Sequence, residues 1–588
     1  MRIVDSLPFA VREIEHVWIP VTDGARLSAR LWLPKTGEPV PAVVEYIPYR
    51  KRDDTRWRDE PMHGYFAGHG YACVRVDVRG SGASDGVLED EYSDAEWADA
   101  LRVLTWIAAQ PWCDGRIGLM GKSWGGINAL QIAALRPPEL RGVVTVCSSD
   151  DRWATDAHWM GGCLLMENLT WGAVLQKLAM RPQDPDLVGP SWRSTWLERL
   201  ASTPFYAARW LEHDTRDTYW RRGSVADAYD RIDVPVLAVS GWADAYADTV
   251  PRLLAGLDVP ARGWVGPWVH VYPHNGVPGP AAGFLQVALA WWDSCLRDRP
   301  SASGEPGYRV WMPEGGGRPW EEATSRGRWV AEAGWPSSRI RERERRLGSE
   351  SGDEVIVPWT GAGALAAGVW CPFGLTGLPC DQGPDDAVSA CFDLPPLGGP
   401  LEILGAPEVD LELRCDRPRG MVAVRLCDVA PDGTSVRVSY GLLDLDLRDG
   451  PSERRPLEPG RRYTVRVRLR HCAWGFRPGH RIRVAISTSY WPIAEPLAEP
   501  FELRLEPGAC VLRLPERPPS DEDTHLPAPP PPEAARSPSF DVEDPPPARR
   551  RVDRDASGRL TTAIRQGWAP DGAPEPYPVE PIGLVNGW

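Results

Sequence analysis

The sequence contains no apolar run that approaches the roughly 20 residues of a membrane-spanning helix. Its N-terminus lacks the basic start and the apolar core of a secretory signal. The formal net charge is −15, and no block of Lys and Arg is longer than 549–551, so the chain has no electrostatic footprint for nucleic acid or anionic lipid. We therefore expect a soluble, cytoplasmic protein that acts on a small molecule and binds neither membranes nor nucleic acid.

The twelve cysteines form no CxxC pair and no compact framework. Cysteines scattered in this way are typical of small buried side chains, not of zinc ligands or disulfides. No group of His, Cys and Asp has metal-ligand spacing either. The sequence thus predicts a protein without a metal or other cofactor, and it leaves open whether the chain forms a homo-oligomer.

Buried parallel strands are indicated in the first half of the chain. Asp23-Gly24 separates two alternating runs, which is typical of a β-hairpin. Short runs rich in Val and Ile then recur, and such runs suit strands that are covered on both faces. They span 42–47, 72–78, 116–120, 142–146 and 234–239. Strands that alternate with helical patterns predict an α/β fold.

At 588 residues the chain is too long for a single core, and changes in its composition and residue pattern divide it into parts. We expect an α/β catalytic domain over 1–300, interrupted by a helical cap over 148–232 that is rich in Trp, Arg and Asp. Alternating apolar and polar residues predict an antiparallel β-sandwich over 301–515. The remainder, 516–588, is a proline-rich linker or surface strap followed by a tail with weak strand signals.

One serine lies between a segment with the pattern of a buried strand and a segment with the pattern of a helix. Gly121-Lys122-Ser123-Trp124-Gly125 fits the pattern G-x-S-x-G, with a buried strand before it and a helix after it. A serine on such a turn projects its hydroxyl above the sheet edge, and the helix N-terminus offers backbone N–H groups to an oxyanion. The alternative is a glycine turn with an incidental serine, but the strand and the helix favour a nucleophile.

A serine nucleophile needs a base, usually a histidine held by a carboxylate. In α/β-hydrolases the chain order is serine, acid, base. Of the ten histidines, those that follow Ser123 outside the cap, the β half and the proline-rich segment are His270 and His274. His270 follows the preceding predicted strand more closely.

The acid is expected after a strand between the serine and these histidines. The run VPVLAVSGWADAYADT contains a buried strand that ends at Gly241-Trp242, and Asp244 comes just beyond it, with Asp248 as a near competitor. Taken singly, Asp244 and His270 are each best interpreted as ordinary loop residues. As an ordered set with Ser123 they predict a catalytic triad.

Five motifs occur in order along the chain: IPYRK, VDVRGSGASDG, QPWCDGRIGLMGKSWGG, SGWAD and GPWVH. Together they resemble the cocaine esterase and Xaa-Pro dipeptidyl-peptidase family of serine hydrolases, which includes glutaryl acylases and α-amino-acid ester hydrolases. The resemblance extends from the opening hairpin to about Leu514, and FRPGHRIRVAIS is similar to the family's jelly-roll domain. It implies an α/β-hydrolase domain with an inserted cap, followed by a jelly-roll β-sandwich.

The resemblance also implies residue roles. Ser123 corresponds to the nucleophile, Asp244 to the acid that orients the base, and His270 to the general base. Tyr49, in the motif PYRK, matches the tyrosine whose hydroxyl forms the oxyanion hole with the N–H after the nucleophile, here that of Trp124. The family's Gly-Trp-Tyr-Asp and Gly-Pro-Trp-Ser-His become Gly-Trp-Ala-Asp and Gly-Pro-Trp-Val-His in this chain, so the neighbours of the acid and the base differ.

The segment RGSGASDG invites comparison with a nucleotide-binding loop. Its third glycine, Gly86, comes one place late for G-x-G-x-x-G, and no helix pattern begins there. We therefore expect no nucleotide site. Asp77 and Arg79 are expected to brace a loop beside the active site, as the resemblance implies.

Charged and aromatic residues of the predicted cap offer two further hypotheses. Its acids are either a solvated acidic face or a site for a substrate amine; they are Asp150, Asp151, Asp156, Asp184 and Asp186. Most tryptophans are expected in cores, but some in the cap are candidates for the wall of an apolar acyl pocket, namely Trp153, Trp159 and Trp171.

These patterns predict a serine hydrolase that cleaves an acyl ester, an amino-acid ester or an amide through an acyl-enzyme. An Xaa-Pro dipeptidyl-peptidase is the alternative among enzymes. A non-catalytic carbohydrate- or partner-binding protein built on the β-sandwich is the alternative from another class, and the ordered triad argues against it.

Overall fold

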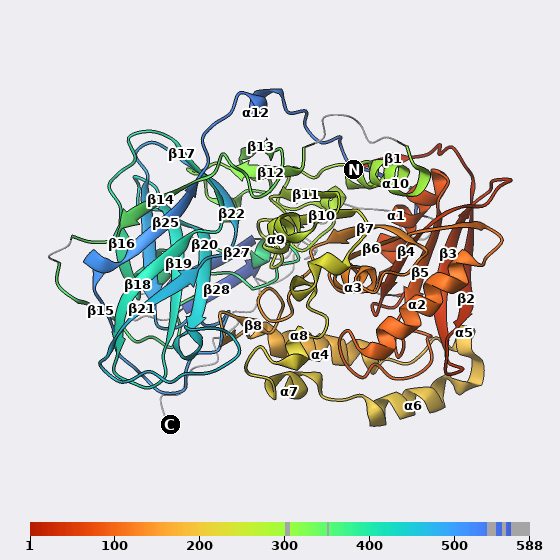
Figure 1. Cartoon of the computed structure of the whole chain (residues 1–588), viewed down its shortest axis with the longest axis horizontal. Helices are drawn as coiled ribbons and strands as arrows, with labels where there is room; N and C mark the ends of the chain where they lie inside the picture. The colour runs from red at the N-terminus through yellow and green to blue at the C-terminus, as the bar shows by residue number, and fades with distance from the viewer. Residues whose placement is uncertain (54, 300–305, 350–351, 538–548, 555–559, 566–588) are drawn as a thin grey trace, which may run out of the picture.

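Two bodies of strands lie side by side in the computed structural model: a large mixed sheet with helices, and an antiparallel β-sandwich (Figure 1). The structure describes residues 1–53, 55–299, 306–349, 352–537, 549–554 and 560–565. No helix in these ranges is long and apolar enough to cross a membrane. All twelve cysteines are free, and most of them are buried.

The large sheet has ten strands, and its central strands run parallel. The strands predicted from Val- and Ile-rich runs are all confirmed, as is the opening hairpin, whose two strands pair antiparallel. In spatial order the strands are β2 (Val11–Pro20), β3 (Arg26–Pro34), β5 (Ala72–Asp77), β4 (Val40–Ile47), β6 (Cys113–Lys122), β7 (Leu140–Val146), β10 (Val236–Gly241), β11 (Ala261–Gly266), β12 (Tyr308–Pro313) and β13 (Gly327–Glu332).

Helices cover both faces of this sheet. Successive residues of one strand enter different cores: Val43 packs in the core that includes residues of α1 (Arg56–Gly68) and α10 (Phe284–Arg297), whereas Val44 packs in the opposite core. Because strand side chains alternate between faces, a strand covered on both faces is apolar at most positions. The opposite core includes residues of α2 (Asp94–Ala108), α3 (Trp124–Ala133) and α9 (Thr249–Gly256).

The stretch between β7 and β10, predicted as an inserted helical cap, is helical. It lies below the sheet in the view of Figure 1. Its elements are the short hairpin β8 (Trp159–Met160) and β9 (Cys163–Leu164), followed by α4 (Glu167–Ala179), α5 (Pro185–Val188), α6 (Trp192–Ser202), α7 (Tyr206–Leu211) and α8 (Thr218–Arg221).

The sandwich consists of an eight-stranded and a four-stranded sheet, and every strand pair in both is antiparallel. The larger sheet contains β14 (Arg341–Arg346), β15 (Val355–Val357), β17 (Leu401–Gly405), β18 (Glu408–Cys415), β21 (Arg462–Arg468), β22 (Cys472–Phe476), β24 (Leu503–Leu505) and β25 (Val511–Glu516). The smaller contains β16 (Ala390–Asp393), β19 (Met421–Val429), β20 (Ser435–Asp444) and β23 (Arg481–Ser487). Their inner faces form one apolar core.

Strand pairing differs from the predicted boundary at 301 in one respect. β12 and β13 lie beyond that boundary, yet β12 pairs parallel with β11 and β13 pairs antiparallel with β12, so both extend the large sheet. All six residues of β12 are buried, which explains the difference: this strand is covered on both faces, as a sheet strand of the first body must be.

The proline-rich segment after the sandwich returns across the first body as an extended strap. The backbone N–H of Gly283 donates to the carbonyl of Pro530, and β26 (Glu533–Ala535) pairs parallel with β1 (Arg2–Val4). Further on, β27 (Arg549–Arg554) and β28 (Leu560–Arg565) form an antiparallel hairpin. The remainder of the predicted tail, 566–588, lies outside the described residues.

Candidate active site

Ser123 occupies a strained turn between β6 and α3. Its backbone has φ 60° and ψ −122°, and a positive φ is uncommon for a residue with a side chain. The Ser123 N–H donates to the carbonyl of Val146 on the neighbouring strand (2.9 Å), while the Ser123 carbonyl accepts from the N–H groups of Gly126 and Ile127. The turn therefore lifts the serine away from the sheet while its backbone is held on both sides.

The two glycines of the motif are required by close approach. A Cβ at Gly121 would lie 2.5 Å from the backbone of Gly125, and a Cβ at Gly125 would lie 2.6 Å from Cγ2 of Ile47. Neither position has room for a methyl group without displacing the strand or the helix. The pattern G-x-S-x-G thus describes how closely α3 packs against the end of β6.

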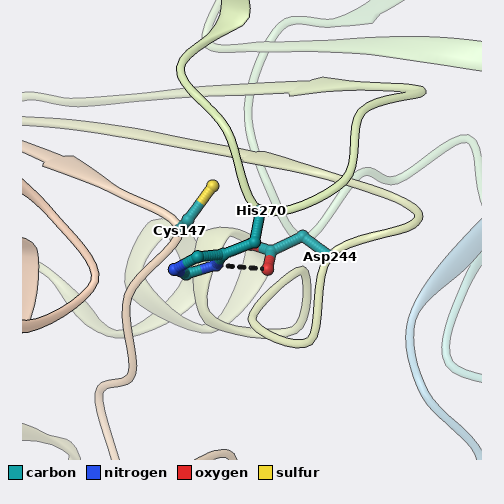
Figure 2. A group of neighbouring side chains, drawn as sticks. All are labelled: Cys147, Asp244 and His270. Carbon is teal, nitrogen blue, oxygen red and sulfur yellow. Dashed lines mark hydrogen bonds and ion pairs between the residues drawn. The ribbon is translucent and has the colours of Figure 1, made fainter. Parts of the chain in front are cut away.

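Asp244 and His270 lie together at the end of the adjacent strands (Figure 2). Asp244 follows β10, and His270 follows β11. Oδ1 of Asp244 accepts from Nδ1 of His270 at 2.8 Å, and Oδ2 accepts from the Ser240 hydroxyl at 2.7 Å. Both residues are almost wholly buried. The geometry leaves Nε2 as the imidazole nitrogen that is free to act on another group.

The environment keeps this pair in the protonation states that a base requires. Burial raises the pKa of Asp244, but its contacts with His270 and Ser240 outweigh burial and hold the pKa below its ordinary value. Burial and the nearby Lys122 ammonium lower the pKa of His270, and Asp244 opposes them only in part. At neutral pH the imidazole is therefore uncharged and able to accept a proton.

Asp248 and His274, the alternative candidates for the acid and the base, make contacts with other residues. Asp248 accepts from Nδ1 of His471 (2.8 Å) and from Nε of Arg470 (3.0 Å), so both carboxylate oxygens are bound to the sandwich. His274 stacks against Tyr272 and Phe284, and burial lowers its pKa to about 3. Its position among aromatic rings is that of a packed core histidine.

Tyr49, in the loop after β4, places its hydroxyl beside Ser123. Burial raises the pKa of Tyr49, while hydrogen bonds with the Ser123 side chain and the Trp124 backbone N–H act in the opposite direction. The hydroxyl is thus within reach of both groups. The Trp124 side chain points elsewhere: it is buried, and its indole N–H donates to Glu96 at 2.6 Å.

A cavity of about 860 Å³ opens onto these groups. Ser123, Tyr49 and His270 all line it, as does Trp171 from the cap. Trp153 and Trp159, the other cap tryptophans considered for such a pocket, instead stack on each other in the core with ring centroids 4.9 Å apart. The acyl-pocket hypothesis is therefore favoured for Trp171 alone among the three.

The sandwich also contributes to this cavity, which the sequence did not reveal. The loop 368–373 places Trp370 and Phe373 in the wall of the cavity. The Phe373 ring packs edge-on against the His270 imidazole, with ring centroids 5.0 Å apart. The backbone N–H of His270 donates to the carbonyl of Pro372 (2.9 Å). These contacts join segments about a hundred residues apart and have no local sequence signal.

Of the five cap acids, Asp156 is the one that lines the cavity. Asp150 pairs with Arg252 (2.8 Å), Asp151 with Arg216 (3.1 Å), and Asp184 with Arg52 (2.8 Å). Asp186 is exposed. The predicted solvated acidic face therefore suits Asp184 and Asp186, whereas Asp150 and Asp151 are buried ion pairs.

The RGSGASDG loop is braced by ion pairs. Asp77 accepts from the backbone N–H of Lys51 (2.9 Å) and from Arg75 (3.2 Å), and Arg79 pairs with Asp99 (2.7 Å) and Asp23 (2.8 Å). These contacts support the expectation that Asp77 and Arg79 hold this loop.

Two groups of acidic, His or Cys side chains that were separate in sequence do come together in the fold. Cys147, Asp244 and His270 are one group, drawn in Figure 2. Burial and Asp244 raise the pKa of Cys147 well above its ordinary value, so its sulfur is a protonated thiol beside the Asp244–His270 pair. The other group, Glu45, Asp59 and His63, lies among buried arginines.

Guanidinium groups already neutralise that second group. Glu45 accepts from Arg58 at 2.6 Å, and Arg58 also donates to Asp59 at 2.6 Å. Arg75 lies 3.2 Å from the other oxygen of Asp59. Two buried positive charges at this position would repel a divalent cation.

Comparison with known proteins agrees with this geometry. The model of the X-Pro dipeptidyl-peptidase (S15 family) matches residues 23–272, and that of the X-Pro dipeptidyl-peptidase C-terminal non-catalytic domain matches residues 301–517. Cocaine esterase from Rhodococcus sp. is 27% identical over 540 residues, which cover 81% of this chain and 91% of that protein.

Solved structures share the fold over most of the chain. A CocE/NonD family hydrolase from Staphylococcus aureus matches with a TM-score of 0.65 at 15% identity, covering 86% of this chain and 94% of that one. An α-amino acid ester hydrolase matches with a TM-score of 0.64 at 18% identity, covering 88% and 98%. The fold is thus that of a two-part hydrolase whose second part is non-catalytic. The chain belongs to the cocaine esterase and X-Pro dipeptidyl-peptidase family of serine hydrolases, as its motifs predicted.

The contacts of the two candidate acids predict different outcomes for two similar variants. We expect Asp244→Asn to lower kcat by about 10⁴-fold, because an amide at this position can hold the wrong imidazole tautomer. Asp248→Asn changes a carboxylate that contacts Arg470 and His471 but not His270, so it is expected to lose much less of its kcat than Asp244→Asn. Steady-state kinetics on an aryl ester decide the matter, and the opposite ranking would transfer the role of acid to Asp248.

Proposed function

We propose that this protein hydrolyses a carboxylic ester through a covalent acyl-enzyme on Ser123. The observation that carries the proposal is the buried Asp244–His270 pair, which opens onto the same cavity as the strained Ser123 turn. A serine lifted by such a turn, a neutral imidazole and a buried carboxylate are the three parts that serine hydrolysis requires.

In the proposed reaction His270 Nε2 takes the Ser123 hydroxyl proton as Oγ attacks the ester carbonyl. Collapse of the tetrahedral intermediate breaks the bond to the leaving alcohol, which receives the proton from His270. Water, deprotonated by the same imidazole, then attacks the acyl-enzyme and releases the acid and free Ser123. Asp244 stabilises the imidazolium that forms in each half.

The oxyanion of each intermediate is proposed to bind between two donors. One is the Trp124 backbone N–H at the start of α3, and the other is the Tyr49 hydroxyl. The support is that Tyr49 shares hydrogen-bonding contacts with both the Ser123 side chain and the Trp124 N–H. Burial keeps the Tyr49 phenol protonated, so it is able to donate.

The fold details are proposed on the same basis. The serine turn after β6, the acid after β10 and the histidine after β11 follow the order serine, acid, base of an α/β-hydrolase. The paired antiparallel sheets are consistent with a jelly roll. Because the sandwich contributes Trp370 and Phe373 to the cavity, a binding protein that uses the sandwich alone is disfavoured.

A second substrate class has a specific observation in its favour. Oδ2 of Asp156 is buried and has no hydrogen-bond partner among the described residues, and burial raises the pKa of Glu167, which lines the same cavity, to about 7. A substrate ammonium beside Asp156 would give its buried Oδ2 a partner. Amino-acid esters, and the N-terminal residues released by an X-Pro dipeptidyl-peptidase, carry such a group.

The nucleophile is tested by labelling with a fluorophosphonate probe. We expect Ser123→Ala to abolish both ester turnover and labelling while the thermal melt is preserved, because the proposed acyl-enzyme and the covalent label both form on the Ser123 hydroxyl. Ser194→Ala, which changes an exposed serine of α6, is the control and should behave as wild type. Mass-spectrometric location of the label on another serine would refute the assignment.

The oxyanion donor is tested by Tyr49→Phe. Removing one hydroxyl while keeping the ring is expected to lower kcat by about 10²- to 10³-fold with little change in KM, since the donor acts on charge that develops in the transition state. Tyr71→Phe removes a buried hydroxyl bound to Asp293, outside the cavity, and serves as the control. Near-normal kcat in Tyr49→Phe, on a substrate with rate-limiting acylation, would make Tyr49 a packing residue.

The amine site is tested by comparing amino-acid esters with matched esters that lack the amine. We expect Asp156→Asn to raise KM for the amino-acid esters by about 10- to 100-fold, because a hydrogen bond to a charged group contributes about 1.5–3 kcal/mol. The amine-free esters should be unaffected. Asp151→Asn, whose acid pairs with Arg216, is the control. An equal effect on both ester series would leave Asp156 with a structural role only.

A further inference from the structure

One arginine of the sandwich is inserted into the loop that carries Asp244. Arg470 lies between β21 and β22. Its Nη2 donates to the main-chain carbonyl of Asp244 at 2.8 Å and to that of Ala245 at 2.7 Å, while its Nε donates to the Asp248 carboxylate at 3.0 Å. The three acceptors belong to one turn of chain between β10 and α9.

The residue after Arg470 holds the same loop. The backbone N–H of His471 donates to Oδ1 of Asp248 at 2.6 Å, and its ring Nδ1 lies 2.8 Å from the same oxygen. Asp248 is therefore bound entirely by two consecutive residues of the sandwich. These contacts explain why an acid so close to Asp244 is unable to replace it.

Arginine suits this position for a physical reason. Its planar guanidinium presents donors in a fixed fork, so one side chain is able to satisfy two carbonyls and a carboxylate at once, whereas a lysine offers a single flexible ammonium. The Arg470 side chain is only 14% exposed, and its backbone N–H is tied to the carbonyl of Tyr440 at 2.9 Å. The donor is thus rigid as well as buried.

The opposite side of the loop is fixed by the first body. The N–H of Asp244 donates to the carbonyl of Gly241 (2.9 Å), and the N–H of Ala243 donates to that of Trp268 (3.2 Å). Carbonyls 244 and 245 face the sandwich instead. Loss of their donor would free the loop to rotate about its remaining anchors, and the Asp244 carboxylate would move relative to His270.

We propose that Arg470 is a positioning residue for catalysis: by binding the carbonyls of residues 244 and 245, the C-terminal domain sets the acid of the triad against His270. The inference rests on the proposed function, because it assigns a partner to the acid of that triad. It gives the domain described as non-catalytic in its relatives a direct effect on the reaction in this chain.

A pH profile separates positioning from mere stabilisation. The groups that face His270 are Asp244, Lys122, Cys147 and Tyr246. Of these, Asp244 raises the pKa of His270, and burial and Lys122 lower it. Activity of the wild type is therefore expected to fall in acid with a midpoint below pH 6.5. If Asp244 moves away, the pKa of His270 falls further and the midpoint shifts to lower pH.

The test compares Arg470→Gln and Arg470→Lys with wild type on an aryl ester. We expect Arg470→Gln to lower kcat by about 10- to 100-fold with KM nearly unchanged, since a displacement of about 1 Å in a catalytic group can cost about 10²-fold. The acid midpoint of kcat should shift downward. Arg470→Lys, which retains one donor, should recover part of kcat.

Arg437→Gln is the matched control. Arg437 belongs to the same domain as Arg470. Its guanidinium lies 4.6 Å from the centroid of the Tyr440 ring and donates a hydrogen bond to Tyr490. Within the described residues it makes no hydrogen bond or ion pair with the loop 244–248. We expect it to keep the wild-type kcat and pH profile even where its melting temperature falls. If Arg470→Gln does not fold, the same comparison with Arg470→Lys carries the test.

Three results are distinguishable. A wild-type kcat and acid midpoint in folded Arg470→Gln, or in Arg470→Lys where Arg470→Gln does not fold, with Ser123→Ala inactive, would overturn the positioning role and leave the proposed function standing. Equal losses in the Arg470 and Arg437 variants would reduce Arg470 to a stabilising residue and also overturn the inference. Activity retained by Ser123→Ala would instead overturn the proposed function itself.

Discussion

The site depends on a carboxylate that has no contact with water. Removing an ionised carboxylate from solvent costs several kcal/mol, and the cost is offset only where donors surround it in good geometry. Asp244 has such donors in His270 and Ser240, so its charge is kept inside the protein. The buried charge in turn fixes the orientation of the imidazole, and it requires a loop that does not move.

This requirement accounts for much of the surrounding architecture. The loop leaves the end of β10 beside β11, so the proposed acid and base follow neighbouring strands. Ser123, the proposed nucleophile, follows β6, which lies two strands from β10 in the sheet, on a turn too tight for any side chain at Gly121 or Gly125. The sandwich closes the far side, with Phe373 against the imidazole and Arg470 against the acid loop.

Much of the first body was predictable from sequence because its signals are local. Val- and Ile-rich runs marked strands buried on both faces, and the glycine spacing marked the Ser123 turn. The candidate triad followed from chain order. The contacts of Asp248, by contrast, depend on His471 from another domain, and no period or turn residue predicts them. The contact of Phe373 with His270 is likewise not predicted by any local pattern. Nor is the pairing of β12 with β11, since the apolar run of β12 was assigned to the sandwich.

The return of the strap to β1 has a consequence for how the chain is made. β1 is synthesised more than five hundred residues before its partner β26. Arg470 likewise follows the loop 244–248 that it binds by more than two hundred residues. During translation the large sheet is therefore able to fold before β1 pairs with the strap and before the loop 244–248 is held by the sandwich. Complete assembly of the proposed site therefore waits for the synthesis of Arg470, and a nascent product that stops before residue 470 would carry a sheet and a serine turn without the clamp on the proposed acid.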